Sequence, residues 1–128
     1  MRDAAPQTIY LDDYTPFGYK VDAVHLTFKL APTATRVLSR IRFSPVPDAA
    51  DKTFFLHGEQ LDLKSAKING VAITPSLTPE GLTAEVPTDP FTFEAEVEIS
   101  PQTNTALEGL YMSSGMYCTQ CEAEGFRK

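Results

Sequence analysis

The sequence predicts an all-β domain, an antiparallel sandwich or a curved two-layer sheet that ends in an irregular C-terminal segment. Several runs alternate apolar and polar side chains, which is the period of a strand with one buried face. No run keeps the 3.6-residue period of an amphipathic helix. Most of the ten prolines fall between the alternating runs, where no ladder N–H is required.

Three long strands are expected, at residues 20–30, 36–43 and 91–99. In each of them apolar side chains occupy alternate positions, so we expect one face of each strand to be buried. The residues expected on the buried faces are Val24, Leu26, Phe28, Leu30, Val37, Ile41, Phe43, Phe91, Phe93, Ala95, Val97 and Ile99.

Shorter strands are expected at residues 54–57 and 82–86. Between them, residues 65–73 contain Asn69-Gly70, two residues that tolerate positive φ. A two-residue type I′ turn requires positive φ at both positions. The sequence therefore predicts a β-hairpin that turns at Asn69-Gly70.

Opposite charges line the polar faces of two of the long strands. Residues 36–43 carry Arg36, Arg40 and Arg42, and residues 91–99 carry three glutamates at alternate positions. If these strands are neighbours in one sheet, the arginines and glutamates can pair across them.

At 128 residues the chain fits one domain, and two regions are distinguished within it. Residues 1–106 form the antiparallel β-domain. Residues 107–128 do not alternate, yet they keep many large apolar side chains, so we expect this segment to lie against something. The isolated chain is also expected to self-associate through such groups.

A formal net charge of −6 disfavours nucleic acid and anionic membranes as partners, since both need a basic face. No apolar run approaches the length of about 18 residues that a membrane span needs. The first residues lack the apolar core of a secretory signal, and two cysteines do not make a disulfide framework. The cytoplasm is therefore the expected location.

Reactive groups are densest in residues 118–125, which read Cys-Thr-Gln-Cys-Glu-Ala-Glu-Gly. Cys118 and Cys121 have the spacing of half a zinc site, but His25 and His57 are too far apart in the sequence to supply the other half. A redox Cys-x-x-Cys would sit in a βαβ context, which is not predicted here. Two spectator thiols are the simplest interpretation.

The same octet offers Glu122 and Glu124 as a carboxylate pair for acid–base catalysis. Such catalysis needs one carboxyl group with a raised pKa in a defined cleft, and the sequence indicates no cleft. The chain contains no His-Glu-x-x-His motif and no phosphate-binding glycine loop. The residues alone therefore show no complete catalytic constellation.

Three stretches of the chain carry a resemblance to a known family. They read DDYTPFGYKVDAVHLTFKL near the start, and ISPQTNTALEGLY followed by MSSGMYCTQCEAEGFRK near the end. The sequence resembles the N-terminal β-domain of bacterial aminopeptidase N, a zinc-dependent aminopeptidase of the gluzincin type. The resemblance spans nearly the whole chain, and the Cys-Thr-Gln-Cys-Glu-Ala-Glu-Gly run is its most specific part.

The resemblance implies that this chain is an N-terminal fragment of a larger enzyme that releases single residues from peptide N-termini. The zinc ligands, and hence the zinc cofactor, would belong to a catalytic domain that follows. The fragment alone would carry no catalytic residues and no metal, and would be inactive. The resemblance also implies two partners, which are a peptide with a free N-terminus and the catalytic domain of the same polypeptide.

The resemblance assigns substrate-binding roles to two residues. Glu122 matches the glutamate that binds the substrate's α-ammonium group, and Gln120 matches a glutamine that borders the pocket for the first residue. Glu124 matches a second glutamate, to which we assign a structural role. An alternative function is a free-standing β-sandwich binding module that uses residues 107–128 as its ligand or partner surface.

Overall fold

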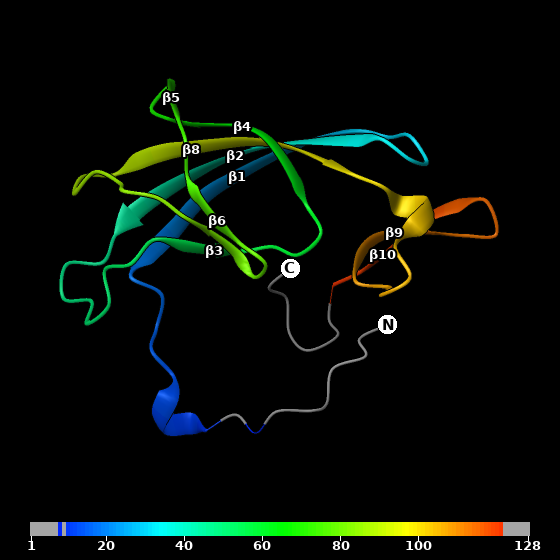
Figure 1. Ribbon diagram of the computed structural model, residues 1–128. Helices are drawn as coiled ribbons and strands as arrows, with labels where there is room; N and C mark the ends of the chain where they lie inside the picture. The colour runs from blue at the N-terminus through cyan, green and yellow to red at the C-terminus, as the bar shows by residue number, and fades with distance from the viewer. Residues whose placement is uncertain (1–7, 9, 122–128) are drawn as a thin grey trace.

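The computed structural model describes Thr8 and residues 10–121, and their fold is the all-β, sandwich-like arrangement that the sequence predicts (Figure 1). The main layer is a five-stranded antiparallel sheet with the order β1-β2-β8-β4-β5. A three-stranded sheet with the order β3-β7-β6 lies beneath part of this layer, and a two-stranded hairpin lies at the other end. No helix in the described part of the chain is long and apolar enough to cross a membrane.

The long strands agree closely with those expected, and residues 91–99 match β8 at both ends. The short β6 was not predicted, because a three-residue strand has too few positions to show alternation. The elements in chain order are η1 (Leu11–Asp13), β1 (Tyr19–Lys29), β2 (Thr35–Pro45), β3 (Phe55–His57), β4 (Asp62–Ile68), β5 (Val71–Ile73), β6 (Ser76–Thr78), β7 (Gly81–Thr83), β8 (Phe91–Ile99), η2 (Pro101–Thr103), β9 (Gly109–Ser113) and β10 (Met116–Gln120).

An aromatic cluster forms the core between the two larger sheets. Phe43 of β2 and Phe91 of β8 stack with ring centroids 5.6 Å apart, and Phe54 meets Phe43 edge to face at 5.0 Å. Phe93 and Tyr19 complete the cluster. Pairs of this geometry each add about 0.5–1.5 kcal/mol beyond the burial of their area. The cluster therefore joins the five-stranded sheet to the segment that leads into β3.

The apolar face of β1 is not buried as the sequence predicts. Val24, Leu26 and Phe28 are 54%, 49% and 48% exposed. Only the first residue of β1, Tyr19, joins the aromatic core beneath the sheet. The prediction of a buried face is therefore wrong for most of this strand.

The predicted hairpin at Asn69-Gly70 is confirmed. Asn69 has φ 50° and Gly70 has φ 80°, as a type I′ turn requires, and the turn joins β4 to β5. The Asn69 side chain also accepts a hydrogen bond from the Thr92 N–H at 3.0 Å. This bond ties the turn to the start of β8.

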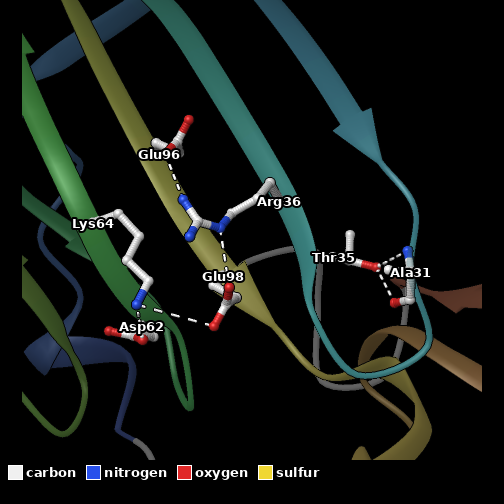
Figure 2. A network of polar contacts seen from close by, with 7 residues as sticks. All are labelled: Ala31, Thr35, Arg36, Asp62, Lys64, Glu96 and Glu98. Atoms are coloured by element: carbon white, nitrogen blue, oxygen red, sulfur yellow. Dashed lines mark hydrogen bonds and ion pairs between the residues drawn. The ribbon is translucent and has the colours of Figure 1, made fainter.

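The strands β2 and β8 are neighbours in one sheet, and the predicted pairing of arginines with glutamates is confirmed for Arg36. Arg36 donates hydrogen bonds to Glu96 at 2.7 Å and to Glu98 at 3.1 Å (Figure 2). Lys64 of β4 extends the network, with its ammonium group 2.7 Å from Asp62 and 4.0 Å from Glu98. The hydrogen bond to Glu98 is the largest cause of the raised pKa of Arg36.

Tyr19 makes the fold sensitive to alkaline pH. Its hydroxyl donates a hydrogen bond to the Lys52 carbonyl at 2.8 Å. Burial first, and then the negative charge of Asp51, raise the pKa of Tyr19 above its usual value. Because the folded pKa exceeds the unfolded one, the stabilisation is fully present below about pH 10 and is lost as the pH rises through the folded pKa.

We expect Tyr19→Phe to lower the free energy of unfolding at pH 7 by about 0.5–1.5 kcal/mol, the usual net value of one hydrogen bond. The difference between wild type and variant should shrink above pH 10, because only the wild type must keep a buried phenol protonated. Urea denaturation of both proteins at pH 7 and pH 11 measures this. An equal difference at the two pH values would contradict the assignment.

Candidate functional site

The strands β9 and β10 form a hairpin inside the segment that was expected to be irregular. Met116 pairs with Ser113, and the turn residues Ser114 and Gly115 have φ 51° and 80°. These angles again indicate a two-residue type I′ turn. The expectation of an irregular segment is therefore wrong for residues 109–120. The dipeptide Ser-Gly was the available signal, but the flanking residues do not alternate clearly enough to reveal two strands.

The side chain of Asn104 holds the base of the hairpin. Its amide nitrogen donates hydrogen bonds to the carbonyls of Glu108 and Leu110, both at 2.8 Å. Two residues near this base, Leu107 and Gly109, have positive φ. The Asn104 amide therefore fixes the backbone where the chain turns into β9.

A second set of contacts links the hairpin to the main sheet. The N–H of Gln102, in η2, donates a hydrogen bond to the Pro32 carbonyl at 2.9 Å. Pro32 lies in the loop between β1 and β2, which the fully buried Thr35 closes. The Thr35 hydroxyl donates to the Ala31 carbonyl at 2.6 Å and accepts from the Ala31 N–H at 2.9 Å (Figure 2). The sheet, this loop, η2 and the hairpin are therefore connected by hydrogen bonds.

Of the two predicted substrate-binding residues, the structure describes one. Gln120 is the last residue of β10, is exposed, and pairs with Gly109 across the hairpin. Glu122 and Glu124 lie outside the described residues. The hairpin therefore fixes the chain up to the position two residues before Glu122.

The cysteines and histidines do not come together as a metal site. Cys118 and Cys121 are free thiols at the end of the hairpin, whereas His25 lies in β1 of the main sheet and His57 ends β3 of the other sheet. Within the described ranges, no group of three or more His, Cys, Asp or Glu side chains could hold a metal ion. These residues do not fit a zinc ion, so no chemical step is assigned to zinc in this part of the chain.

A hollow of about 300 Å³ lies at the base of the hairpin. Its lining comes from the β3–β4 connection, from the end of β8 with η2, and from the start of β9. It includes the carboxylates of Glu59 and Glu108, and none of its described lining residues is Lys, Arg or His. Sequence reasoning missed this concavity because its residues come from irregular segments that show no periodic pattern.

Apolar side chains on the hairpin, and one just before it, stay partly exposed among the described residues. Leu107 is 49% exposed, Met116 is 63% exposed and Tyr117 is 37% exposed. An exposed group of this kind is typical of a surface that packs against another part of a protein. The expectation that residues 107–128 lie against something stays a prediction.

Comparison with known proteins confirms the resemblance to aminopeptidase N. The chain is 42% identical over 130 residues to a protein of Caulobacter vibrioides named Aminopeptidase N, a match that covers 99% of this chain and 15% of the relative. It is 41% identical over 124 residues to Aminopeptidase N of Escherichia coli, covering 95% of this chain and 14% of the relative. No protein-family model matches the sequence.

A solved structure supports the same relationship. The fold matches Legionella pneumophila aminopeptidase A in complex with aspartic acid with a TM-score of 0.77 and 29% sequence identity. The match covers 91% of this chain and 14% of that one. The chain therefore corresponds to a small part of much longer aminopeptidases.

We expect Asn104→Ala to loosen the hairpin without unfolding the sheets. The variant loses both hydrogen bonds to the carbonyls of Glu108 and Leu110, so amide exchange in β9 and β10 should accelerate by roughly tenfold, equivalent to ~1.4 kcal/mol. Hydrogen–deuterium exchange read by mass spectrometry measures this. Gln102→Ala is the matched control, since it keeps the backbone N–H that bonds to Pro32. Equal exchange in Asn104→Ala and wild type would show that Asn104 does not hold the hairpin.

Proposed function

We propose that this chain is the substrate-recognition part of an aminopeptidase and binds the free α-ammonium group of a peptide. The observation that carries the proposal is the 42% identity to Aminopeptidase N over 99% of the chain. The match includes the region of the hairpin and of the run that contains Gln120 and Glu122.

Glu122 is proposed to accept hydrogen bonds from the substrate ammonium group. A carboxylate excluded from water recognises a cation through charge-assisted hydrogen bonds, each worth roughly 1.5–3 kcal/mol. It also rejects a blocked N-terminus, because a neutral amide would leave the buried carboxylate unpaired. Gln120 is proposed to border the pocket for the first residue of the substrate.

The geometry of the hairpin supports this proposal. An exopeptidase must hold the ammonium group at a fixed distance from the bond that it cleaves, so the recognising carboxylate needs a rigid support. β10 ends at Gln120, two residues before Glu122, and its hairpin is held at the base by Asn104. The link between Gln102 and Pro32 extends this support to the main sheet.

The remaining machinery is proposed to lie outside these residues. The catalytic domain of the same polypeptide would supply the zinc ion and its ligands, and would pack against the exposed apolar side chains of the hairpin. When bound there, zinc would polarise the scissile carbonyl and activate water. The cytoplasmic location stays a prediction from the sequence.

In the full-length enzyme, we expect Glu122→Gln to lower kcat/KM for free-amine substrates by roughly tenfold to a few hundredfold. This range corresponds to ~1.5–3 kcal/mol for a lost charge-assisted hydrogen bond. The variant keeps the shape of the side chain, so zinc content and thermal stability should barely change. The ratio of kcat/KM for free-amine substrates to kcat/KM for N-acetylated substrates should also fall. Steady-state kinetics with free and acetylated substrates, together with metal analysis, measure these effects.

Glu124→Gln is the matched control for Glu122→Gln, since both remove one charge from the same run. We expect it to affect kcat/KM much less. If both variants are folded and zinc-loaded and Glu124→Gln is the more damaging, the recognition role belongs to Glu124. If neither variant changes kcat/KM, the proposed function of this run is wrong.

We expect the 128-residue chain alone to hydrolyse no aminoacyl-arylamide substrate, with or without added zinc. The reason is that the described residues offer no ligand set for zinc. Release of the arylamine is measured by absorbance, and bound metal is measured on protein purified without an affinity tag. Stoichiometric zinc, or turnover that zinc restores, would contradict this expectation.

A further inference from the structure

The strand β1 leaves one of its sides open. It is an edge strand of the five-stranded sheet, and within the described part of the chain it pairs only with β2. It is eleven residues long, whereas β5 at the opposite edge has three residues. Proteins usually keep edge strands short or cover them, because a long open edge invites pairing with another strand.

The inner face of β1 is apolar, and the described residues leave it partly exposed. Val24 and Phe28 lie opposite Ile41 and Val37 of β2, so these side chains share one face of the sheet. Val24, Leu26 and Phe28 are nevertheless about half exposed. The three-stranded sheet lies beneath part of this face (Figure 1), and among the described residues the buried core includes only the first residue of β1.

The outer face of the same edge is basic. His25 lies opposite Arg40, and Lys29 lies opposite Arg36, whose guanidinium already pairs with two glutamates of β8. Lys29 and Arg40 therefore supply the positive charge that this edge offers to a further strand. The chain as a whole carries a formal charge of −6, which makes this edge an exception. A strand added beside β1 would therefore find an apolar stripe on one face and positive charge on the other.

The sheet already contains a strand that matches this pattern. β8 alternates apolar residues with glutamates and lies on the other side of β2. Its glutamates meet Arg36, with Arg36 Nη1 2.7 Å from Glu96 and Nε 3.1 Å from Glu98. A strand that alternates apolar and acidic residues therefore fits beside β2, which alternates apolar and basic residues.

We propose that the open side of β1 binds one more extended strand, in which apolar residues alternate with acidic ones. We assign this strand to a part of the parent polypeptide outside these 128 residues. The relatives named Aminopeptidase N are matched over only 14–15% of their length, so such a parent has ample chain to supply it. A strand within the same polypeptide also acts at an effective concentration in the millimolar range, which favours it over a separate partner.

The test compares amide exchange on β1 in the 128-residue chain and in the full-length protein that contains it. The amides of β1 that do not bond to β2 should exchange at least about tenfold more slowly in the full-length protein. Amides of β2, which have strands on both sides in the chain itself, serve as the internal control. Equal exchange on β1 in the two proteins would overturn the proposal.

Variants of β1 test the apolar stripe. Leu26→Lys places a charge on the inner face and should remove the added protection of β1 in the full-length protein. Thr27→Lys is the matched control, because it adds the same charge to the outer face. Neither variant should change exchange in the isolated chain, where both positions are exposed. Protection of β1 that survives Leu26→Lys would contradict the proposed contact.

A third variant tests the acidic character of the added strand. Lys29→Glu should speed exchange on β1 in the full-length protein by about 1.5- to fivefold, the range of one cross-strand charge pair, and Lys29→Arg should not. If Lys29→Glu leaves exchange on β1 in the full-length protein unchanged, the added strand does not carry the proposed acidic residues. Sedimentation of the isolated chain as a dimer that Leu26→Lys dissociates would assign the open edge to a second copy instead, and would overturn the proposed source.

Discussion

The alternation of apolar and acidic residues along β8 is the constraint on which the rest of the structure depends. Phe91 and Phe93 point into the aromatic core, and the glutamates on the other face meet Arg36. β8 also pairs with both β2 and β4, so it lies at the centre of the main sheet. Its end leads directly into η2 and the hairpin. A shift of β8 by one residue would place Thr92 and Glu94 where the two phenylalanines lie, and would break all of these contacts together.

Much of the main sheet was predictable because period-two alternation is a strong local signal. It gave the bounds of β8 and the pairing of Arg36 with glutamates. The turn at Asn69-Gly70 came from a different local signal, two residues that tolerate positive φ. Period-two alternation failed for the environment of β1. Alternation predicts which side chains share a face, but burial depends on what covers that face, and Leu26 stays about half exposed.

The roles of Gln120 and Glu122 stay predictions that rest on a resemblance. The period of the sequence gave no indication that Gln120 ends a strand. The support of the hairpin was hidden for a different reason. Asn104 bonds to backbone carbonyls, and the link from Gln102 to Pro32 joins segments about 70 residues apart. Such contacts leave no pattern in side-chain polarity.

The two-residue turn at Ser114 and Gly115 has a consequence for how this molecule can change in length. In a hairpin closed by a type I′ turn, the side chains of the returning strand are assigned to their faces by counting from the turn. One residue inserted there that shifts the pairing would turn Gln120 to the opposite face. Insertions should be tolerated instead in connections such as the one between β2 and β3, whose residues do not set the register of β10. For protein engineering, this means that the hairpin is a poor place for insertions and that the loops between sheets are better ones.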